Sequence, residues 1–151
     1  MATIALVGAT GNFGHKLLPI LSSESSFAEI RSLSRHARSS PDLPKIKSVK
    51  VDFTDSTSLE NALRGCDALI NAMGTNLDHL SSKKALVDAA AKVGVKIYIP
   101  RCGSFPDHSL IASEFGVDPH VDSEFIRHPM WDTKKSHDTY AESKGLKVIS
   151  I

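Results

Sequence analysis

The chain begins with an apolar run that passes directly into a glycine-rich turn. Residues 4–7 read Ile-Ala-Leu-Val with no polar alternation, a pattern typical of a parallel strand that is buried on both faces. Apolar residues then recur at helical spacing, which predicts a helix that runs to about Ser22 or Glu24. Pro19 lies inside this helix, where it should remove a hydrogen bond or bend the axis.

Strand and helix patterns alternate along the rest of the chain. Strands are predicted over 28–34, 46–51, 67–73, 95–99 and 146–151, and helices from Asp55 or Ser56 to Gly65, from Ser81 or Ser82 to Lys92, and over 133–143. This alternation predicts an α/β protein with a doubly wound parallel sheet. With 151 residues, 41% of them hydrophobic, the chain can bury one core, so a single domain over residues 1–151 is expected.

Three glycines, each three residues after the last, follow the first strand. Gly8 is expected to permit a tight turn, Gly11 to let the backbone approach a pyrophosphate, and Gly14 to let the next helix pack close to the strand. The uncapped N–H groups at the start of that helix form an anion site. We therefore predict a dinucleotide site with contacts from Gly8, Thr10, Gly11, Asn12, Phe13 and Gly14. The alternative is a turn whose glycines serve packing alone.

The end of the second strand decides which dinucleotide is held, because ligands lie outside the carboxyl ends of the strands in such sheets. Arg35 follows that strand, at a position where an acidic residue would bind a ribose hydroxyl and an arginine would pair with a 2′-phosphate. We therefore predict NADP (NADPH) rather than NAD, with Arg35 and Arg38 as candidate partners. Alternatively, Arg35 is an ordinary surface charge.

The ends of the third and fourth strands complete the predicted cofactor site. Asp52 and Phe53 follow the third strand and are placed to flank an adenine ring, unless Asp52 only caps its loop. Ala72, Met73 and Gly74 end the fourth strand as an edge of small residues over which the cofactor can lie. In the alternative interpretation, Gly74 ends the strand and Met73 fills the core.

The last predicted helix carries two sets of candidates for chemistry. Tyr140 and Lys144 match the YxxxK pattern of classical short-chain dehydrogenases, but they lie at the far end of the helix, away from the ligand edge. Lys134 and Lys135 fall in its first predicted turn. A lysine there can contact a cofactor ribose or donate a proton to a developing alkoxide or enolate, unless the two form only a solvated surface pair.

Charge and composition narrow the range of partners. The 18 basic and 17 acidic residues give a net charge of +1, which provides no electrostatic footprint for nucleic acid or an anionic membrane. We see no apolar run of membrane-spanning length and no signal segment, so a cytoplasmic location is expected. The seven histidines and two cysteines show no metal-ligand spacing, so neither a metal site nor a disulfide is predicted.

Four features together carry a family resemblance over almost the whole chain. They are GATGNFG at residues 8–14, Arg35 after the second strand, SEFGVD at residues 113–118, and Lys134 eleven residues before Gly145. This combination resembles the isoflavone reductase-like, NmrA-like group of atypical short-chain dehydrogenases. The resemblance implies an NADPH-binding Rossmann domain, with the family's general acid or cofactor-contacting lysine at Lys134 and no catalytic role for the YxxxK tyrosine.

The sequence departs from that group in two ways, and both affect the activity that the resemblance implies. Residues 101–112 separate Pro100 from Ser113, which family members join directly, so we expect either an added loop or a splice artefact there. Family enzymes are also much longer, with a substrate lobe after the sixth strand. We therefore expect the chain to correspond to the cofactor domain, truncated before most of the substrate pocket.

The resemblance favours an NADPH-dependent reductase that delivers hydride to a small unsaturated or carbonyl-bearing substrate. One alternative is an NmrA-like redox sensor that binds the dinucleotide and signals to a protein partner without turnover. The other is an inactive truncated product. We expect weak or absent catalysis from the chain as given, even when the cofactor is bound.

Overall fold

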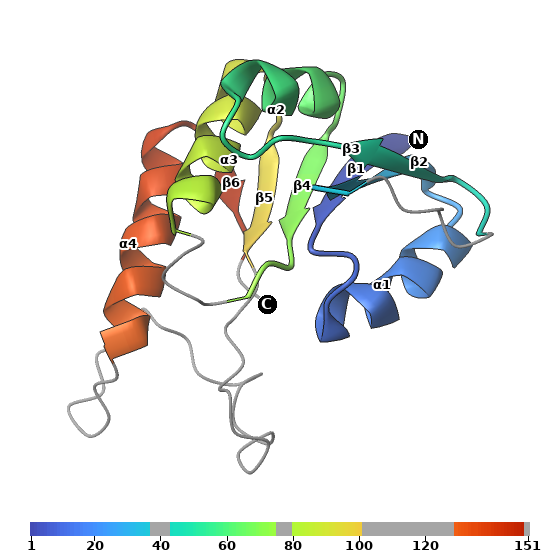
Figure 1. The fold of residues 1–151 in the computed structure, drawn as a ribbon, viewed down its shortest axis with the longest axis horizontal. Helices are drawn as coiled ribbons and strands as arrows, with labels where there is room; N and C mark the ends of the chain where they lie inside the picture. Colours follow the sequence, from blue (N-terminus) through green and yellow to red (C-terminus); the bar gives the residue numbers. More distant parts are fainter. Residues whose placement is uncertain (37–42, 75–79, 101–128, 150–151) are drawn as a thin grey trace, which may run out of the picture.

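The computed structural model describes residues 1–36, 43–74, 80–100 and 129–149, with the backbone alone for 129–134. Within these segments six strands form one sheet, in which every described pairing is parallel (Figure 1). The strands are β1 (Ala2–Val7), β2 (Phe27–Ser34), β3 (Ile46–Lys50), β4 (Ala68–Asn71), β5 (Ile97–Pro100) and β6 (Lys147–Val148). Their spatial order, β3-β2-β1-β4-β5-β6, is that of a doubly wound dinucleotide-binding sheet. The predicted fold class is confirmed.

Helices cover both faces of this sheet (Figure 1). They are α1 (Asn12–Ser23), α2 (Ser56–Leu63), α3 (Leu80–Lys92) and α4 (Pro129–Ser143). Two separate hydrophobic clusters show which helix packs on which face: α1 contributes to the one that contains Ile4 and Leu6, and α2, α3 and α4 to the one that contains Ala5 and Val7. Strand β1 is therefore buried on both faces, as its unbroken apolar run predicted.

Two elements differ from their predicted bounds in ways that affect the site. Helix α4 begins at Pro129 rather than at Thr133, which fits the preference of proline for the first helical turn, where its missing N–H costs nothing. Strand β4 ends at Asn71, two residues earlier than predicted. There the Asn71 side chain accepts a hydrogen bond from the Met73 amide (3.1 Å), an arrangement that turns the chain out of the strand.

Helix α1 runs through Pro19, the position at which the sequence predicted a conflict. Pro19 is exposed, so its ring lies toward solvent and away from the sheet. No helix in the described segments is both long and apolar enough to cross a membrane. The segments 101–112 and 113–118, with their predicted insertion and SEFGVD motif, lie outside the described residues.

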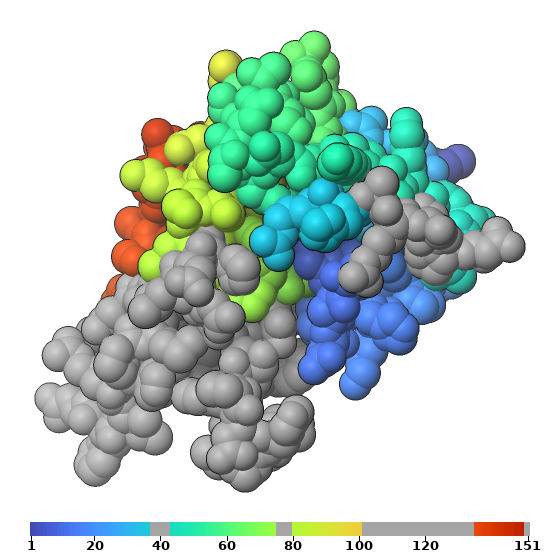
Figure 2. All heavy atoms as spheres, in the orientation of Figure 1, coloured from blue at the N-terminus to red at the C-terminus, as the bar shows by residue number. Residues whose placement is uncertain are grey.

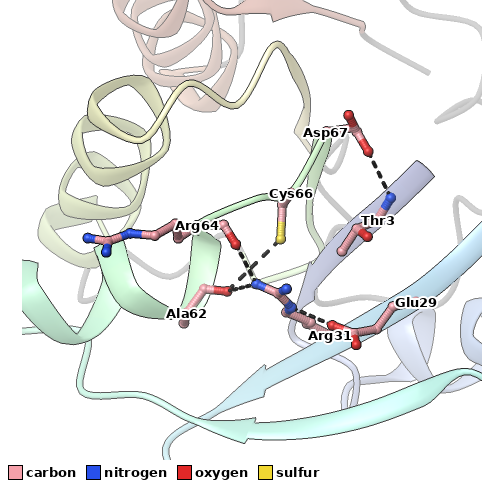
Figure 3. A network of polar contacts seen from close by, with 7 residues as sticks. All are labelled: Thr3, Glu29, Arg31, Ala62, Arg64, Cys66 and Asp67. Atoms are coloured by element: carbon pink, nitrogen blue, oxygen red, sulfur yellow. Dashed lines mark hydrogen bonds and ion pairs between the residues drawn. The ribbon is translucent and has the colours of Figure 1, made fainter. Parts of the chain in front are cut away.

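A partly buried arginine on β2 ties the sheet to the end of α2 (Figure 3). Arg31 donates from Nη1 to the carbonyl oxygens of Ala62 (3.0 Å) and Arg64 (2.7 Å), and from Nε to Glu29 (2.6 Å). The last carbonyls of a helix lack partners within the helix and attract cations. The Cys66 thiol lies beside this cluster in the interior, and burial raises its pKa. Sequence reasoning had not singled out Arg31.

Candidate cofactor site

The turn between β1 and α1 is built around Gly8. Its φ of +82° lies in the left-handed region, which residues with a side chain rarely adopt. A Cβ on Gly8 would also lie 2.6 Å from the carbonyl carbon and oxygen of Ala72 and 2.9 Å from the Met73 nitrogen. The turn therefore packs directly on the peptide that follows β4, and glycine is needed for two independent reasons.

Gly14 and Gly11 play different parts at the start of α1. A Cβ on the buried Gly14 would overlap the Gly8 carbonyl oxygen and lie 2.6 Å from the Ala9 Cα, so the start of the helix packs directly on the turn that follows β1. Gly11 has an ordinary φ of −78° and caps α1 without a side-chain hydrogen bond. Its backbone does not require glycine, so its predicted role in letting a pyrophosphate approach stays a prediction.

The first turn of α1 has the properties of an anion site. The N-cap is Gly11, no acidic residue lies in the first turn, and Asn12 is exposed, as is Thr10 just before the helix. Amide N–H groups at a helix start lack partners within the helix and lie at the positive end of its dipole. Phe13, in contrast, is half-buried against the hydrophobic cluster on the α1 face, which indicates a packing role for its side chain.

The carboxyl end of β2 lies beside that of β1, where Leu33 pairs with Val7, and β3 lies on the other side of β2. In the space-filling view the cyan atoms at the end of β2 adjoin blue atoms of the first segment of the chain (Figure 2). Arg35 is exposed directly after β2, and the Val51 amide donates to the Ser34 carbonyl (2.9 Å), which continues the β2–β3 pairing to this edge. The predicted contact of Arg35 with the cofactor stays a prediction. Arg38 lies outside the described residues.

Asp52 and Phe53 are engaged within the protein. The Asp52 carboxylate accepts hydrogen bonds from the Thr54 amide (2.8 Å) and hydroxyl (2.6 Å), and these bonds lower the pKa of Asp52. Phe53 is half-buried against the larger hydrophobic cluster. Asp52 therefore caps its own loop, the alternative interpretation of this residue, and its predicted contact with an adenine stays untested.

The end of β4 combines small residues with a buried polar group. Ala72 is buried, Met73 is half-buried against the larger cluster, and Gly74 is exposed, with nothing within 4 Å of the position of a Cβ. Asn71 is only 3% exposed. Its Nδ2 donates to the Tyr98 hydroxyl (2.8 Å), so a side chain on β5 holds the end of β4 in place.

Tyr98 and His137 were missed by sequence reasoning. The Tyr98 hydroxyl lies 2.8 Å from His137 Nε2, and the two rings meet edge to face. Burial raises the pKa of Tyr98 and lowers that of His137. A signal was present, because the tyrosine stands in the apolar run Ile-Tyr-Ile, and a buried tyrosine hydroxyl needs a partner.

Helix α4 places the candidate lysines differently from the prediction. Because it begins at Pro129, Lys134 and Lys135 lie in its second turn rather than its first. This corrects their predicted position, while the earlier start adds a turn on the side of the carboxyl ends of the strands. The Lys135 side chain is exposed, and the Lys134 side chain lies outside what the structure describes.

The YxxxK pair lies at the far end of α4, as its position in the sequence predicted. The Tyr140 hydroxyl donates to Asp88 on α3 (2.5 Å), and Lys144 Nζ lies 3.5 Å from the same carboxylate. The hydrogen bond to Asp88 raises the pKa of Tyr140, whereas a general acid or base works best with a pKa near the operating pH. This geometry indicates a structural role, in which Tyr140 and Lys144 connect α4 to α3 through Asp88.

Comparisons with known proteins identify the class of domain. A family model described as NAD(P)H-binding matches residues 8–151. No curated protein sequence matches the chain. The match confirms the predicted NAD(P)-binding domain, whereas the individual contact residues stay predictions.

Solved structures share the fold at low sequence identity. The chain is similar to AtPrR2 with NADP+ and (+)-pinoresinol (20% identity, TM-score 0.72, 99% of this chain and 48% of that one). It is also similar to the NADPH-dependent quinone oxidoreductase QOR2 from Escherichia coli, solved with NADPH (18%, 0.71, 97% and 47%), and to NmrA, a negative transcriptional regulator (20%, 0.69, 99% and 44%). At these identities the likenesses show a shared fold. The chain spans about half of the length of these structures.

Proposed function

The chain belongs to the NAD(P)H-binding family, and on that premise we propose that it is the cofactor domain of an NADPH-dependent reductase of the isoflavone reductase-like type. NADPH would supply a hydride to a small substrate with a carbonyl or a polarised double bond. Folds like this one are found in QOR2 and in AtPrR2, which were solved with NADPH and with NADP+ and (+)-pinoresinol. In this proposal the substrate site lies in the part of a longer protein that the chain does not span.

The observation that carries the proposal is the packing of the β1–α1 turn. Neither Gly8 nor Gly14 has room for a Cβ, so the turn packs directly on the Ala72–Met73 peptide and the start of α1 packs directly on the Gly8 carbonyl. The N-cap of α1, Gly11, offers the first amides of the helix no side-chain hydrogen bond, and no acidic residue lies in the first turn. These amides would bind the pyrophosphate, with Thr10 and Asn12 adding hydrogen bonds from their exposed side chains.

The preference for NADP rests on Arg35. Its side chain is exposed at the carboxyl end of β2, the strand that pairs with β1. A guanidinium pairs with a phosphate in a fork of two hydrogen bonds, whereas a ribose hydroxyl offers it no charge. Arg35 would therefore distinguish the 2′-phosphate of NADP from the 2′-hydroxyl of NAD.

Titration of the chain with NADPH and NADH, followed by nicotinamide fluorescence, tests both the proposed dinucleotide binding and the proposed preference for NADP. The variant Arg35→Ala should lose about 1.5 to 3 kcal/mol of NADPH binding energy, the range of a hydrogen bond to a charged group, with little change for NADH. Arg64→Ala is the matched control, because it removes the same charge from an exposed site that precedes β4, whereas Arg35 follows the carboxyl end of β2. Equal losses for both dinucleotides in Arg35→Ala would refute the phosphate contact, and no binding by the unaltered chain would refute the proposed function.

Lys134 is the proposed catalytic residue, as a donor to the cofactor ribose or to the developing oxyanion. The competing function is a dinucleotide-binding regulator without turnover, favoured by the fold likeness to NmrA. Oxidation of NADPH by a longer protein containing this domain, tested with quinone and aromatic substrates, separates the two. A reductase turns over and loses turnover in Lys134→Ala, whereas a regulator binds NADPH and consumes none.

The remaining proposals concern partners and location. A small-molecule substrate is proposed for the reductase, and a protein partner for the regulator. With a net charge of +1, we propose no nucleic-acid or membrane partner, and the cytoplasm is the proposed location. We also propose that the 151-residue chain alone catalyses weakly or not at all.

A further inference from the structure

A chain of hydrogen bonds runs through the interior from α4 to the glycine turn. His137 Nε2 lies 2.8 Å from the Tyr98 hydroxyl, which accepts from Asn71 Nδ2 at 2.8 Å. Asn71 Oδ1 in turn accepts from the Met73 amide at 3.1 Å. The Met73 nitrogen stands 2.9 Å from the position that a Cβ on Gly8 would take. Four elements, α4, β5, β4 and the β1–α1 turn, are connected in this way.

The hydrogen bonds in this chain have a single consistent direction. Because Asn71 Oδ1 accepts from a backbone N–H, the other end of its amide is the donor to the Tyr98 oxygen. His137 Nε2 accepts from the Tyr98 O–H when the histidine is neutral with its proton on Nδ1, and the direction of this bond depends on that tautomer. We assign this tautomer because an Nε2–H would direct a second donor at the Tyr98 oxygen and leave the Tyr98 O–H without this acceptor.

The surroundings of His137 favour this neutral form. Burial lowers the pKa of His137, and the positive charge of Lys83 on α3 acts in the same direction. From β5, Tyr98 faces the ring with a pKa that burial raises, and the adjacent Asp138, buried on α4, adds to that increase. Both groups of the His137–Tyr98 pair are therefore uncharged near neutral pH.

The peptide held by Asn71 is the one on which the glycine turn packs. The Ala72 amide donates to the Val7 carbonyl (2.8 Å), which extends the β1–β4 pairing to the last residue before Gly8. The next amide, that of Met73, is held by the Asn71 side chain. Movement of Asn71 would therefore move the Ala72–Met73 peptide against Gly8, where glycine has no spare room.

We propose that Tyr98 and His137 are positioning residues for the dinucleotide site, because through Asn71 they fix the Ala72–Met73 peptide against Gly8 and so set the shape of the glycine turn. The inference rests on the proposed function, since it concerns the affinity of the same cofactor site. A phenylalanine would fill the volume of the Tyr98 ring, so packing alone does not account for a buried hydroxyl that needs two partners. Removing that hydroxyl, or protonating His137, weakens cofactor binding.

The first test compares two substitutions that each delete one tyrosine hydroxyl bonded across an interface with α4. Tyr98→Phe removes the hydroxyl between Asn71 and His137, and Tyr140→Phe removes the one bonded to Asp88. We expect Tyr98→Phe to raise the Kd for NADPH about threefold to tenfold, the equivalent of one net hydrogen bond. Tyr140→Phe should leave that Kd unchanged. Equal Kd values in both variants, or equal increases in both, would overturn the inference.

The second test uses His137→Gln, whose side-chain oxygen accepts a hydrogen bond at every pH. Between about pH 8 and the lowest pH at which the chain stays folded, the unaltered chain should lose more NADPH affinity than His137→Gln does, because only the histidine at position 137 takes up a proton. Burial and Lys83 lower the pKa of His137, so the difference should appear below the usual pH range of histidine. Protonation of the cofactor itself affects its binding to both proteins equally, so it does not contribute to the difference between their pH profiles. Parallel pH profiles of the unaltered chain and His137→Gln would contradict the proposal. This test does not use Tyr98→Phe, so it remains decisive if that variant fails to fold.

Hydrogen exchange at the Met73 amide separates this inference from the proposed function. In the ligand-free chain, Tyr98→Phe should speed exchange at Met73 and Tyr140→Phe should not. If the unaltered chain binds no dinucleotide, the proposed function fails, and unchanged Met73 exchange would then overturn the positioning role independently. If the chain binds NADPH and Tyr98→Phe alters neither Kd nor Met73 exchange, the positioning role fails and the proposed function stands.

Discussion

Replacing Arg31 with methionine isolates the contribution of its guanidinium to the stability of the fold. Methionine keeps an unbranched side chain to cover the neighbouring apolar surface. The substitution removes two hydrogen bonds to the carbonyl oxygens of Ala62 and Arg64 and one to Glu29 (Figure 3). The first two bonds connect β2 to the end of α2, and the third lies within β2.

The expected loss follows from the exposure of each partner. The Arg31 side chain is 21% exposed, so its two bonds to helix-end carbonyls contribute about 1 kcal/mol each. The Glu29 side chain is 34% exposed, and such a pair near the surface adds about 0.5 kcal/mol. Arg31→Met should therefore lower the free energy of unfolding by about 2 to 3 kcal/mol.

Urea unfolding followed by circular dichroism measures this loss, and two further variants act as controls. Lys92→Met breaks an ion pair with Glu60 in which the lysine is 69% exposed, and should cost less than about 0.5 kcal/mol. Glu29→Gln should account for only the smaller part of the Arg31 effect. The reasoning is refuted if Arg31→Met costs no more than Lys92→Met, or if Glu29→Gln reproduces the whole loss.

Two further predictions concern the glycine turn and the buried thiol. Gly14→Ala should destabilise the chain by about 2 kcal/mol or more and weaken NADPH binding, because its Cβ would overlap the Gly8 carbonyl; Gly74→Ala, which meets no neighbouring atom, is the control for stability in the same unfolding assay, and equal losses would contradict the argument. Cys66 should react with a thiol reagent only as the chain unfolds, because burial raises its pKa. Fast labelling that Cys66→Ser abolishes in the native state would show this to be wrong.

Most of the fold could be predicted because its signals are local. The unbroken apolar run of β1, the helical spacing after it and the glycine after β1 each report the conformation of neighbouring residues. Strand and helix alternation then leaves few topologies for a parallel sheet. Boundaries were less accurate, since α4 begins at Pro129 and β4 ends at Asn71, where proline chemistry and a side-chain hydrogen bond override periodicity.

The candidate site was predicted less completely. The sequence identified which residues stand at strand ends, but not which side chains are already engaged. Asp52 binds its own loop through Thr54, and Phe53 packs on the core. Both observations depend on contacts that no spacing along the chain reports.

The sequence by itself determined a β1–turn–α1 unit with glycines at the two positions where the chain has no room for a Cβ, and with it the class of ligand. Only the tertiary structure decided that the peptide after β4 lies against Gly8, that Tyr98 reaches Asn71 on one side and His137 on the other, and that Arg31 caps α2. The physical reason is that periodicity and turn chemistry act within a few residues, whereas these contacts join segments that only close packing of the sheet and helices brings together.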